Sequence, residues 1–194
     1  MDGILAYMFT MIREAHRCGR PLTRHQLTEA GRDIRLFPGV EGWFGRINAF
    51  GASLGVTVEH YIISSGLKEI LEGCSIGAEF KEIFASEFYY GEDGEAAWPK
   101  LAVNYTSKTQ FVYRINKGVL DVSDDKTLND SMPDDSKRVP FTNMIYLGDG
   151  LSDVPCMKMM QSYGGASIAV YKEMGQSVKD LLERGRVDYI YPAD

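Results

Sequence analysis

Hydrophobic and polar residues follow two different periods along the chain, and these periods separate predicted strands from predicted helices. The clearest strand is Met144–Leu147, a run of apolar, strand-forming residues that stops at a glycine. Such a run is typical of a buried parallel strand. The same reasoning predicts strands at residues 56–64, 80–90, 98–105, 166–171 and 187–191. The turn sequence GEDGE makes the strands at 80–90 and 98–105 either a β-hairpin or two strands that flank a turn.

Helical spacing, with an apolar residue at every third or fourth position, predicts the remaining elements. Thr23 and Gln26 form a capping-box pattern, and Leu22 and Leu27 are placed for a hydrophobic staple, so one helix starts here. The helix before it ends at Gly19 and begins at residue 2 or 3 with no recognisable cap. Further helices are predicted around residues 67–71, 107–117 and 178–182, and after Ser152.

The pattern changes near Pro38, and we place a junction between two parts of the chain there. Val40, Trp43, Phe44 and Ile47 follow at helical spacing and form the apolar stripe of a helix that packs on a sheet. Residues 1–37 are accordingly predicted to form a small helical part. Residues 38–194 are predicted to form the main α/β domain.

Composition narrows the classes of function. A net charge of −6 without a long basic run argues against a nucleic-acid surface or an anionic membrane, and favours small molecules or cations as partners. The cysteines Cys18, Cys74 and Cys156 are odd in number and widely spaced, which indicates neither a disulfide framework nor a zinc site. No apolar run approaches the roughly 20 residues of a membrane helix, and no basic signal-peptide start is present. We therefore expect a cytoplasmic protein.

Candidate chemistry lies at the end of the strand Met144–Leu147, in the sequence GDGLSD. Asp149 sits at the strand tip between two glycines, where backbone can approach a small ligand closely. Ser152 is expected to cap the following helix, with Pro155 in its first turn, so Asp153 lies at the helix N-terminus. Two carboxylates at the carboxyl end of a strand suggest a hard cation. The alternative makes Asp149 a turn former and Asp153 a partner of the helix dipole.

Two further positions carry groups suited to binding an anion. Ser64 and Ser65 precede Gly66 at the end of the strand 56–64, where a hydroxyl and free N–H groups can form an oxyanion or phosphate cradle. The alternative is that one serine caps the next helix. Lys108 stands in the first turn of its helix, where the dipole disfavours a cation, so we expect an anionic neighbour.

Other ionisable residues are expected to be structural. Six aspartates lie between Asp121 and Asp135, but the sixth and twelfth positions of a calcium loop are Lys126 and Met132 here, so a solvated surface loop is predicted. His16 is expected to be a surface or capping residue. A dinucleotide-binding fingerprint fits GDGLSD less well, because Asp153 stands where the third glycine would be.

Ser64 at one strand tip, Lys108 at a helix start and GDGLSD at another strand tip occur in the order and setting of the haloacid dehalogenase superfamily. The chain resembles the phosphoserine-phosphatase-like branch from about Phe37 onward. The resemblance implies a Rossmann-like, three-layer α/β sandwich with a parallel sheet. The helices before Phe37 then resemble a truncated helical cap.

This resemblance implies a Mg²⁺-dependent phosphatase that forms and hydrolyses an aspartyl phosphate on a small phosphorylated substrate. Ser64 and the backbone N–H of Ser65, with Gly66 beside them, would bind phosphoryl oxygens, and Lys108 would neutralise their charge. Asp149 would ligate Mg²⁺. Asp153 would hold the metal through a water or anchor Lys108. The metal would act as Lewis acid and template.

The sequence departs from the family at the nucleophile, which belongs to a DxDxT motif on the first strand. The 194 residues contain no such motif, since the nearest candidate, DVSDDKT from Asp121, has the wrong spacing and place. We therefore expect the chain to begin inside the cap and to be inactive or nearly so. The alternative is a non-catalytic module that binds metal and phosphate.

The missing first strand also has a structural consequence. In the family it lies between the strands ending at Ser64 and Asp149, so its absence would leave a slot of roughly 10 Å in the sheet. The flanking strands could pair directly, a segment of this or another copy could insert, or a separate piece could complete the sheet.

Overall fold

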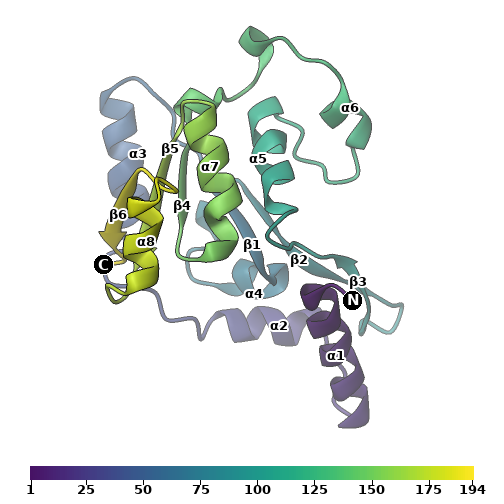
Figure 1. Cartoon of the computed structure of the whole chain (residues 1–194). Coiled ribbons are helices and arrows are strands. Elements are labelled where there is room, and N and C mark those ends of the chain that lie inside the picture. The colour runs from purple at the N-terminus through teal and green to yellow at the C-terminus, as the bar shows by residue number, and fades with distance from the viewer. The chain divides into compact units, whose positions relative to one another are not determined.

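The computed structural model describes all 194 residues, which form both helices and strands, as the hydrophobic periods predict (Figure 1). The α/β class is confirmed, with parallel strand pairs in two sheets. The chain consists of two compact units, unit 1 from Met1 to Asn104 and unit 2 from Tyr105 to Asp194. This division does not bear on the junction predicted near Pro38, which falls within unit 1.

Unit 1 contains a mixed three-stranded sheet in the order β1-β2-β3. Strand β1 (Tyr61–Leu67) runs parallel to β2 (Glu82–Tyr90), and β2 pairs antiparallel with β3 (Ala96–Leu101), which confirms the predicted hairpin. The prediction that the first strand spans 56–64 is wrong at both ends. The ladder begins where Tyr61 meets Glu82, and after an irregularity it extends to Leu67.

Four α-helices and one 3-10 turn complete unit 1. They are α1 (Gly3–Arg17), α2 (Arg24–Gly31), α3 (Trp43–Ser53), α4 (Lys68–Gly73) and η1 (Gly77–Glu79). The capping box of Thr23 and Gln26 is confirmed at the start of α2. The expectation that α1 lacks a cap is wrong, because Asp2 Oδ1 accepts hydrogen bonds from the N–H groups of Ile4 and Leu5 at 3.0 and 3.1 Å.

Helix α3 forms as predicted but does not bury the whole of its apolar surface. Phe44 is buried within unit 1 and makes edge contacts with His60 and Phe80. Trp43 remains 38% exposed and Phe50 63% exposed. The helical period identifies apolar positions correctly, but of these three aromatic side chains only Phe44 is buried.

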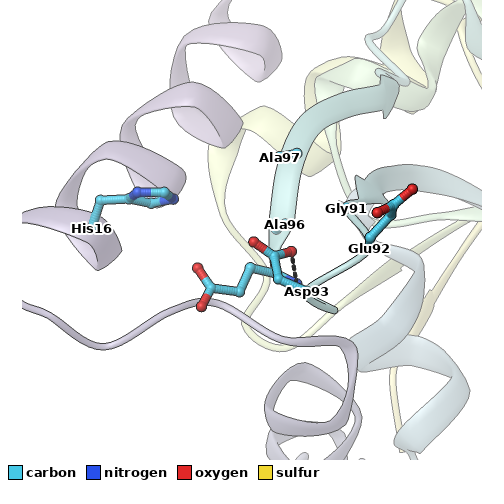
Figure 2. A pocket seen from close by; sticks show the side chains of 7 residues that line it. His16, Gly91, Glu92, Asp93, Ala96 and Ala97 are labelled. Carbon is cyan, nitrogen blue, oxygen red and sulfur yellow. Dashed lines mark hydrogen bonds between the residues drawn. The ribbon is translucent and has the colours of Figure 1, made fainter.

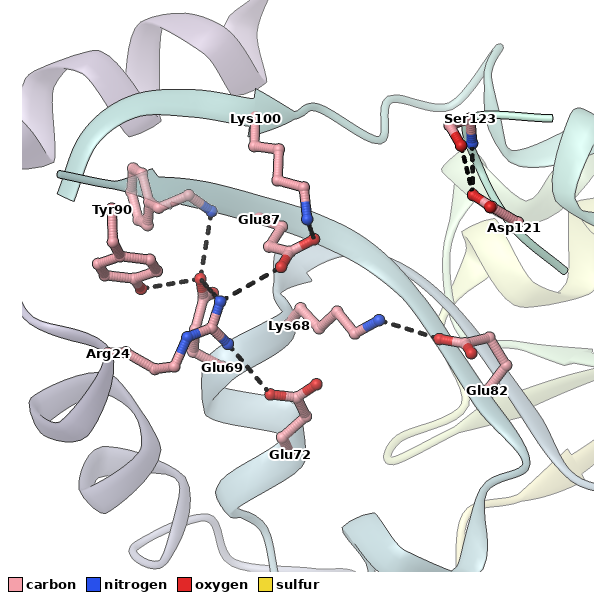
Figure 3. Close-up of polar contacts among 11 residues, drawn as sticks. Arg24, Lys68, Glu69, Glu72, Glu82, Glu87, Tyr90, Lys100, Asp121 and Ser123 are labelled. Carbon is pink, nitrogen blue, oxygen red and sulfur yellow. Dashed lines mark hydrogen bonds and ion pairs between the residues drawn. The ribbon is translucent and has the colours of Figure 1, made fainter. Parts of the chain in front are cut away.

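A charged network inside unit 1 joins α2, α4 and β2 (Figure 3). Glu69 is fully buried, and its Oε1 accepts hydrogen bonds from the Tyr90 hydroxyl at 2.8 Å and the Phe88 N–H at 3.2 Å. Arg24 approaches the same oxygen at 3.9 Å and lies over the Tyr90 ring at 4.8 Å. Burial raises the pKa of Tyr90, and the bond to Glu69 raises it further.

Unit 2 contains an all-parallel sheet in the order β4-β5-β6, formed by Ile145–Gly148, Ala166–Tyr171 and Tyr189–Pro192. Helices α7 (Val154–Ser162) and α8 (Gln176–Glu183) both pack on one face (Figure 1). Their core contains Met157, Leu181 and Ala169.

The other face of this sheet carries exposed apolar side chains, among them Ile145 at 63% and Leu147 at 47%. The prediction that Met144–Leu147 is a buried strand is therefore wrong, although its parallel pairing with β5 is confirmed. Strands β1 and β4 are each edge strands of separate sheets, so each has one row of backbone groups without a strand partner.

Helix α5 (Lys108–Lys117) forms in the predicted range and ends at Gly118, which adopts the left-handed conformation. From α5, the buried Arg114 shapes the acidic segment that follows. Its guanidinium donates to the carbonyl oxygens of Asp121, Val122 and Asp124 and to the carboxylate of Asp125. The segment is largely exposed, which confirms the predicted surface loop. The remaining short elements are α6 (Asp125–Asn129), η2 (Asp134–Ser136), η3 (Phe141–Asn143) and η4 (Leu151–Asp153).

None of the helices combines the length and the apolar character needed to cross a bilayer.

Helices α2 and α4 approach so closely that only glycine fits at their contact. A Cβ on Gly31 would lie 2.1 Å from the Ile70 carbonyl oxygen, and one on Gly73 would lie 1.9 Å from the Thr28 carbonyl oxygen. Both obstacles are backbone atoms, so the helices themselves would have to move apart.

Replacing Gly73 with alanine should therefore lower the free energy of unfolding by ~3 kcal/mol, because the added methyl group forces the helices apart. Gly45→Ala is the matched control in α3, where a Cβ meets nothing within 4 Å. There alanine should stabilise by about 0.5–1 kcal/mol. Urea unfolding followed by circular dichroism measures both. Equal effects of the two changes would contradict the close contact.

Candidate functional site

The loop after β4 leaves Asp149 exposed to solvent. Its carboxylate is exposed and takes part in no hydrogen bond or ion pair. Gly148 is required just before it, because a Cβ there would lie 2.6 Å from the Asp153 side chain. The tight turn thus leaves one carboxylate free and brings the second back against the strand end.

Asp153 is buried and forms an ion pair with Lys108, whose Nζ lies 2.7 Å from Oδ1. Lys108 is also buried, at 6% exposure, and the expectation that it has an anionic neighbour is confirmed. The Tyr146 hydroxyl donates to the same Oδ1 at 2.8 Å, and the Gly150 N–H donates to Oδ2 at 3.3 Å. Three donors therefore share the two carboxylate oxygens.

The predicted cap at Ser152 is wrong. Residues Leu151–Asp153 form a 3-10 turn, and α7 begins at Val154 with Asp153 in the N-cap position. The Asp153 side chain makes no capping bond, because Lys108 and Tyr146 occupy it. Pro155 does fall in the first turn of α7, as predicted.

Cys156 lies beside this cluster and is fully buried. Burial raises the pKa of its thiol to about 11, although the hydrogen bond with Tyr146 and the charge of Lys108 both lower it. Burial likewise raises the pKa of Tyr146 well above its usual value, and the nearby Cys156 and Asp153 add to the effect. The cluster therefore keeps its thiol and its phenol protonated at neutral pH.

Ser64, Ser65 and Gly66 belong to unit 1, at the irregular end of β1. Ser64 Oγ accepts a hydrogen bond from the Gly66 N–H at 3.0 Å, and the Ser65 carbonyl accepts one from the Ser86 hydroxyl at 3.2 Å. The N-cap of α4 is Leu67, so the alternative in which a serine caps this helix is wrong.

The residues predicted for the site thus fall into two groups. Unit 2 joins Lys108 to Asp153 and places Asp149 four residues before it, whereas Ser64 and its neighbours lie in unit 1. Sequence reasoning missed Tyr146 and Cys156. A tyrosine in an otherwise aliphatic strand directly before GDG was the available signal, since a buried phenol needs a hydrogen-bond partner.

The carboxylates of unit 2 differ in how well they fit a metal ion. No group of three or more histidine, cysteine, aspartate or glutamate side chains is arranged to hold one. Mg²⁺ is usually bound by one or two carboxylates, with waters and substrate phosphates completing its shell. Asp149, with its free carboxylate, fits that role. Asp153 fits an anchor for Lys108 better than a direct ligand, because both its oxygens already accept hydrogen bonds.

Unit 1 also has a shallow pocket, which contains none of the residues predicted for the site (Figure 2). It lies between the C-terminal part of α1, where His16 is exposed as predicted, and the tip of the β2–β3 hairpin. Its other lining residues are Gly91, Glu92, Asp93, Glu95, Ala96 and Ala97. Asp93 already accepts a hydrogen bond from the Glu95 N–H at 3.0 Å, which shapes the hairpin turn.

Comparison with known proteins gives no activity for the chain. No protein-family model matches it. A protein of Borreliella burgdorferi that is described only as uncharacterized is 27% identical over 203 aligned residues. The match covers 94% of this chain and 69% of that protein. The chain is therefore similar over nearly its whole length to a bacterial protein whose description states no function.

Removing one partner of the buried pair should be costly. Asp153→Asn leaves the Lys108 ammonium buried without a counter-charge, so we expect a loss of about 3–5 kcal/mol in the free energy of unfolding. Asp134→Asn is the matched control, because Asp134 pairs with Lys137 at 2.6 Å but is 95% exposed. It should give no measurable change. Urea unfolding that shows equal effects would contradict the burial of the Lys108–Asp153 pair.

The thiol of Cys156 should resist alkylation. At pH 8 a thiol with a pKa of about 11 has a thiolate fraction on the order of 10⁻³, and burial also blocks the reagent. Cys18 is exposed and serves as the internal control. With iodoacetamide and mass spectrometry, we expect Cys156 to react at least ~100-fold more slowly than Cys18 in the folded chain. In urea the rates should converge. Rapid labelling of Cys156 in the folded chain would contradict the burial and the raised pKa of its thiol.

Proposed function

We propose that the chain is a phosphatase-type hydrolase of the haloacid dehalogenase superfamily that depends on Mg²⁺ and acts on a small phosphorylated substrate. The observation that carries the proposal is the buried Lys108–Asp153 pair at the carboxyl end of β4, beside the free carboxylate of Asp149. A cation this deeply buried is expensive unless it is paired or serves to bind an anion.

In this proposal Lys108 supplies positive charge to a phosphoryl group. The Lys108 ammonium donates one of its three protons in the hydrogen bond to Asp153, so the other two remain available to phosphoryl oxygens. Phosphoryl transfer is accelerated mainly by positioning and by stabilisation of developing charge, which a fixed ammonium provides. Asp153 would act through Lys108 by holding it in place.

Asp149 would hold Mg²⁺ through its carboxylate. Bound there, the metal would supply Lewis-acid stabilisation of a phosphoryl oxygen. The phosphate-binding role of Ser64, Ser65 and Gly66 is part of the proposal only as an expectation of the family resemblance, since these residues lie in unit 1. The family fold, with its Rossmann-like three-layer core, and a cytoplasmic location belong to the same proposal.

The absence of the family's nucleophile motif from these residues leaves room for a second candidate function. No two aspartates in the 194 residues are separated by a single residue, so the DxDxT pattern is absent from them. These residues alone should therefore bind phosphate without turning it over, because the remaining groups only position and stabilise charge. The same observation favours the second candidate, a regulatory module that binds metal and phosphate without catalysis.

Binding of inorganic phosphate tests the shared part of both candidates. Titration calorimetry should show phosphate binding that MgCl₂ strengthens. Lys108→Met should weaken binding about tenfold or more, since it removes a charged hydrogen-bond donor. Asp149→Asn should abolish the Mg²⁺ effect, and Asp134→Asn should change neither. Absence of Mg²⁺-dependent binding at millimolar phosphate would refute the proposal.

Turnover of p-nitrophenyl phosphate with Mg²⁺ then tests the expected inactivity of these 194 residues. We expect no hydrolysis above that of the Asp149→Asn variant. Robust hydrolysis that Asp149→Asn abolishes would contradict the expected inactivity. It would mean that another side chain of the 194 residues serves as nucleophile.

A further inference from the structure

We propose that Tyr146 is a positioning residue that fixes Asp153 and, through it, the ammonium group of Lys108. Its hydroxyl donates to Asp153 Oδ1 at 2.8 Å, the same oxygen that accepts from Lys108 Nζ at 2.7 Å. Neither the sequence patterns nor the comparisons assign Tyr146 a role. The part of the inference that concerns phosphate rests on the proposed function, whereas the part that concerns Lys108 does not.

Geometry makes the two donors interdependent. A carboxylate oxygen has two lone pairs, and with Tyr146 on one of them Lys108 must use the other. The Gly150 N–H holds Oδ2 at the same time, so the carboxylate cannot rotate without losing a bond. One lysine position therefore satisfies all three donors.

Tyr146 is well placed to fix the Asp153 carboxylate because it belongs to strand β4. Its ring packs against the core cluster of Met157, Ala169 and Leu181, on the face of the sheet that α7 and α8 cover. A rigid, packed ring carries its hydroxyl to a fixed point, whereas a long flexible donor would have to be ordered first. A phenylalanine would fill the same core space, so the hydroxyl itself is the informative atom.

The hydroxyl also changes what Asp153 offers to Lys108. The hydrogen bond from Tyr146 withdraws negative charge from Oδ1. Lys108 is therefore anchored by a carboxylate whose charge is already partly neutralised. The ammonium then keeps more of its charge for another anion. This is the property that a phosphate-binding lysine needs, and a simple isolated ion pair would not provide it.

The test observes the Lys108 ammonium directly by ¹H–¹⁵N NMR of lysine NH₃⁺ groups in the full chain, with Lys108→Met to assign the signal. Tyr146→Phe should shift or broaden it. Tyr113→Phe is the matched control in the same unit, because its hydroxyl bonds to Tyr163 at 3.1 Å and touches neither Lys108 nor Asp153. The control should leave the signal in place. An unchanged Lys108 signal in folded Tyr146→Phe would overturn the proposal.

If Tyr146→Phe does not fold, 3-fluorotyrosine incorporated at position 146 keeps the size and changes only the acidity of the donor. It should move the Lys108 signal, and failure to do so would equally overturn the proposal. Neither measurement depends on phosphate, so their outcome is independent of the proposed function.

A double-mutant cycle with inorganic phosphate extends the test to binding. Tyr146→Phe should weaken phosphate binding about tenfold when Lys108 is present, and less than about twofold in the Lys108→Met background, because the effect passes through the lysine. Equal losses in both backgrounds would show a merely structural role. A wild-type chain that binds no phosphate would refute the proposed function and leave the NMR result standing.

Discussion

A charge taken out of water must be hydrogen-bonded, and each unit of this chain is built around one such carboxylate. Glu69 in unit 1 and Asp153 in unit 2 each accept from a tyrosine hydroxyl and a backbone N–H, and each faces a cation. The cations differ. Arg24 is 45% exposed and stands 3.9 Å from Glu69, whereas Lys108 is buried and stands 2.7 Å from Asp153. The first arrangement joins helices and strand in a core, and the second fixes an ammonium group where β4 ends.

Much of the fold follows from interactions within a few residues, and that part was predictable from the sequence. The capping box at Thr23, the left-handed end of α5 at Gly118 and the parallel strand before GDG all depend on near neighbours in the chain. The pairing of Lys108 with an anion was also predictable, because an unfavourable helix position demands a compensating partner.

The errors share a cause, which is that strand limits and burial depend on distant partners. β1 begins where β2 is available to pair, and helices α7 and α8 cover only one face of the sheet that contains β4, so alternate residues of β4 stay exposed. Tyr146 was missed because its role depends on a carboxylate that a 3-10 turn carries back to it. The division into units at Asn104 and Tyr105 likewise reflects packing between distant segments, which no local composition records.

The loop that Arg114 holds has a consequence for how this chain can change. The three carbonyl groups that the guanidinium binds belong to the main chain, which every amino acid supplies alike. The path of residues 121–124 therefore depends on Arg114 together with two side chains of the loop, since Asp121 accepts hydrogen bonds from Ser123 and Asp124 accepts one from the Thr127 N–H. An exposed position such as Val122, whose part in this network is its carbonyl group alone, can therefore change its side chain while the loop keeps its path.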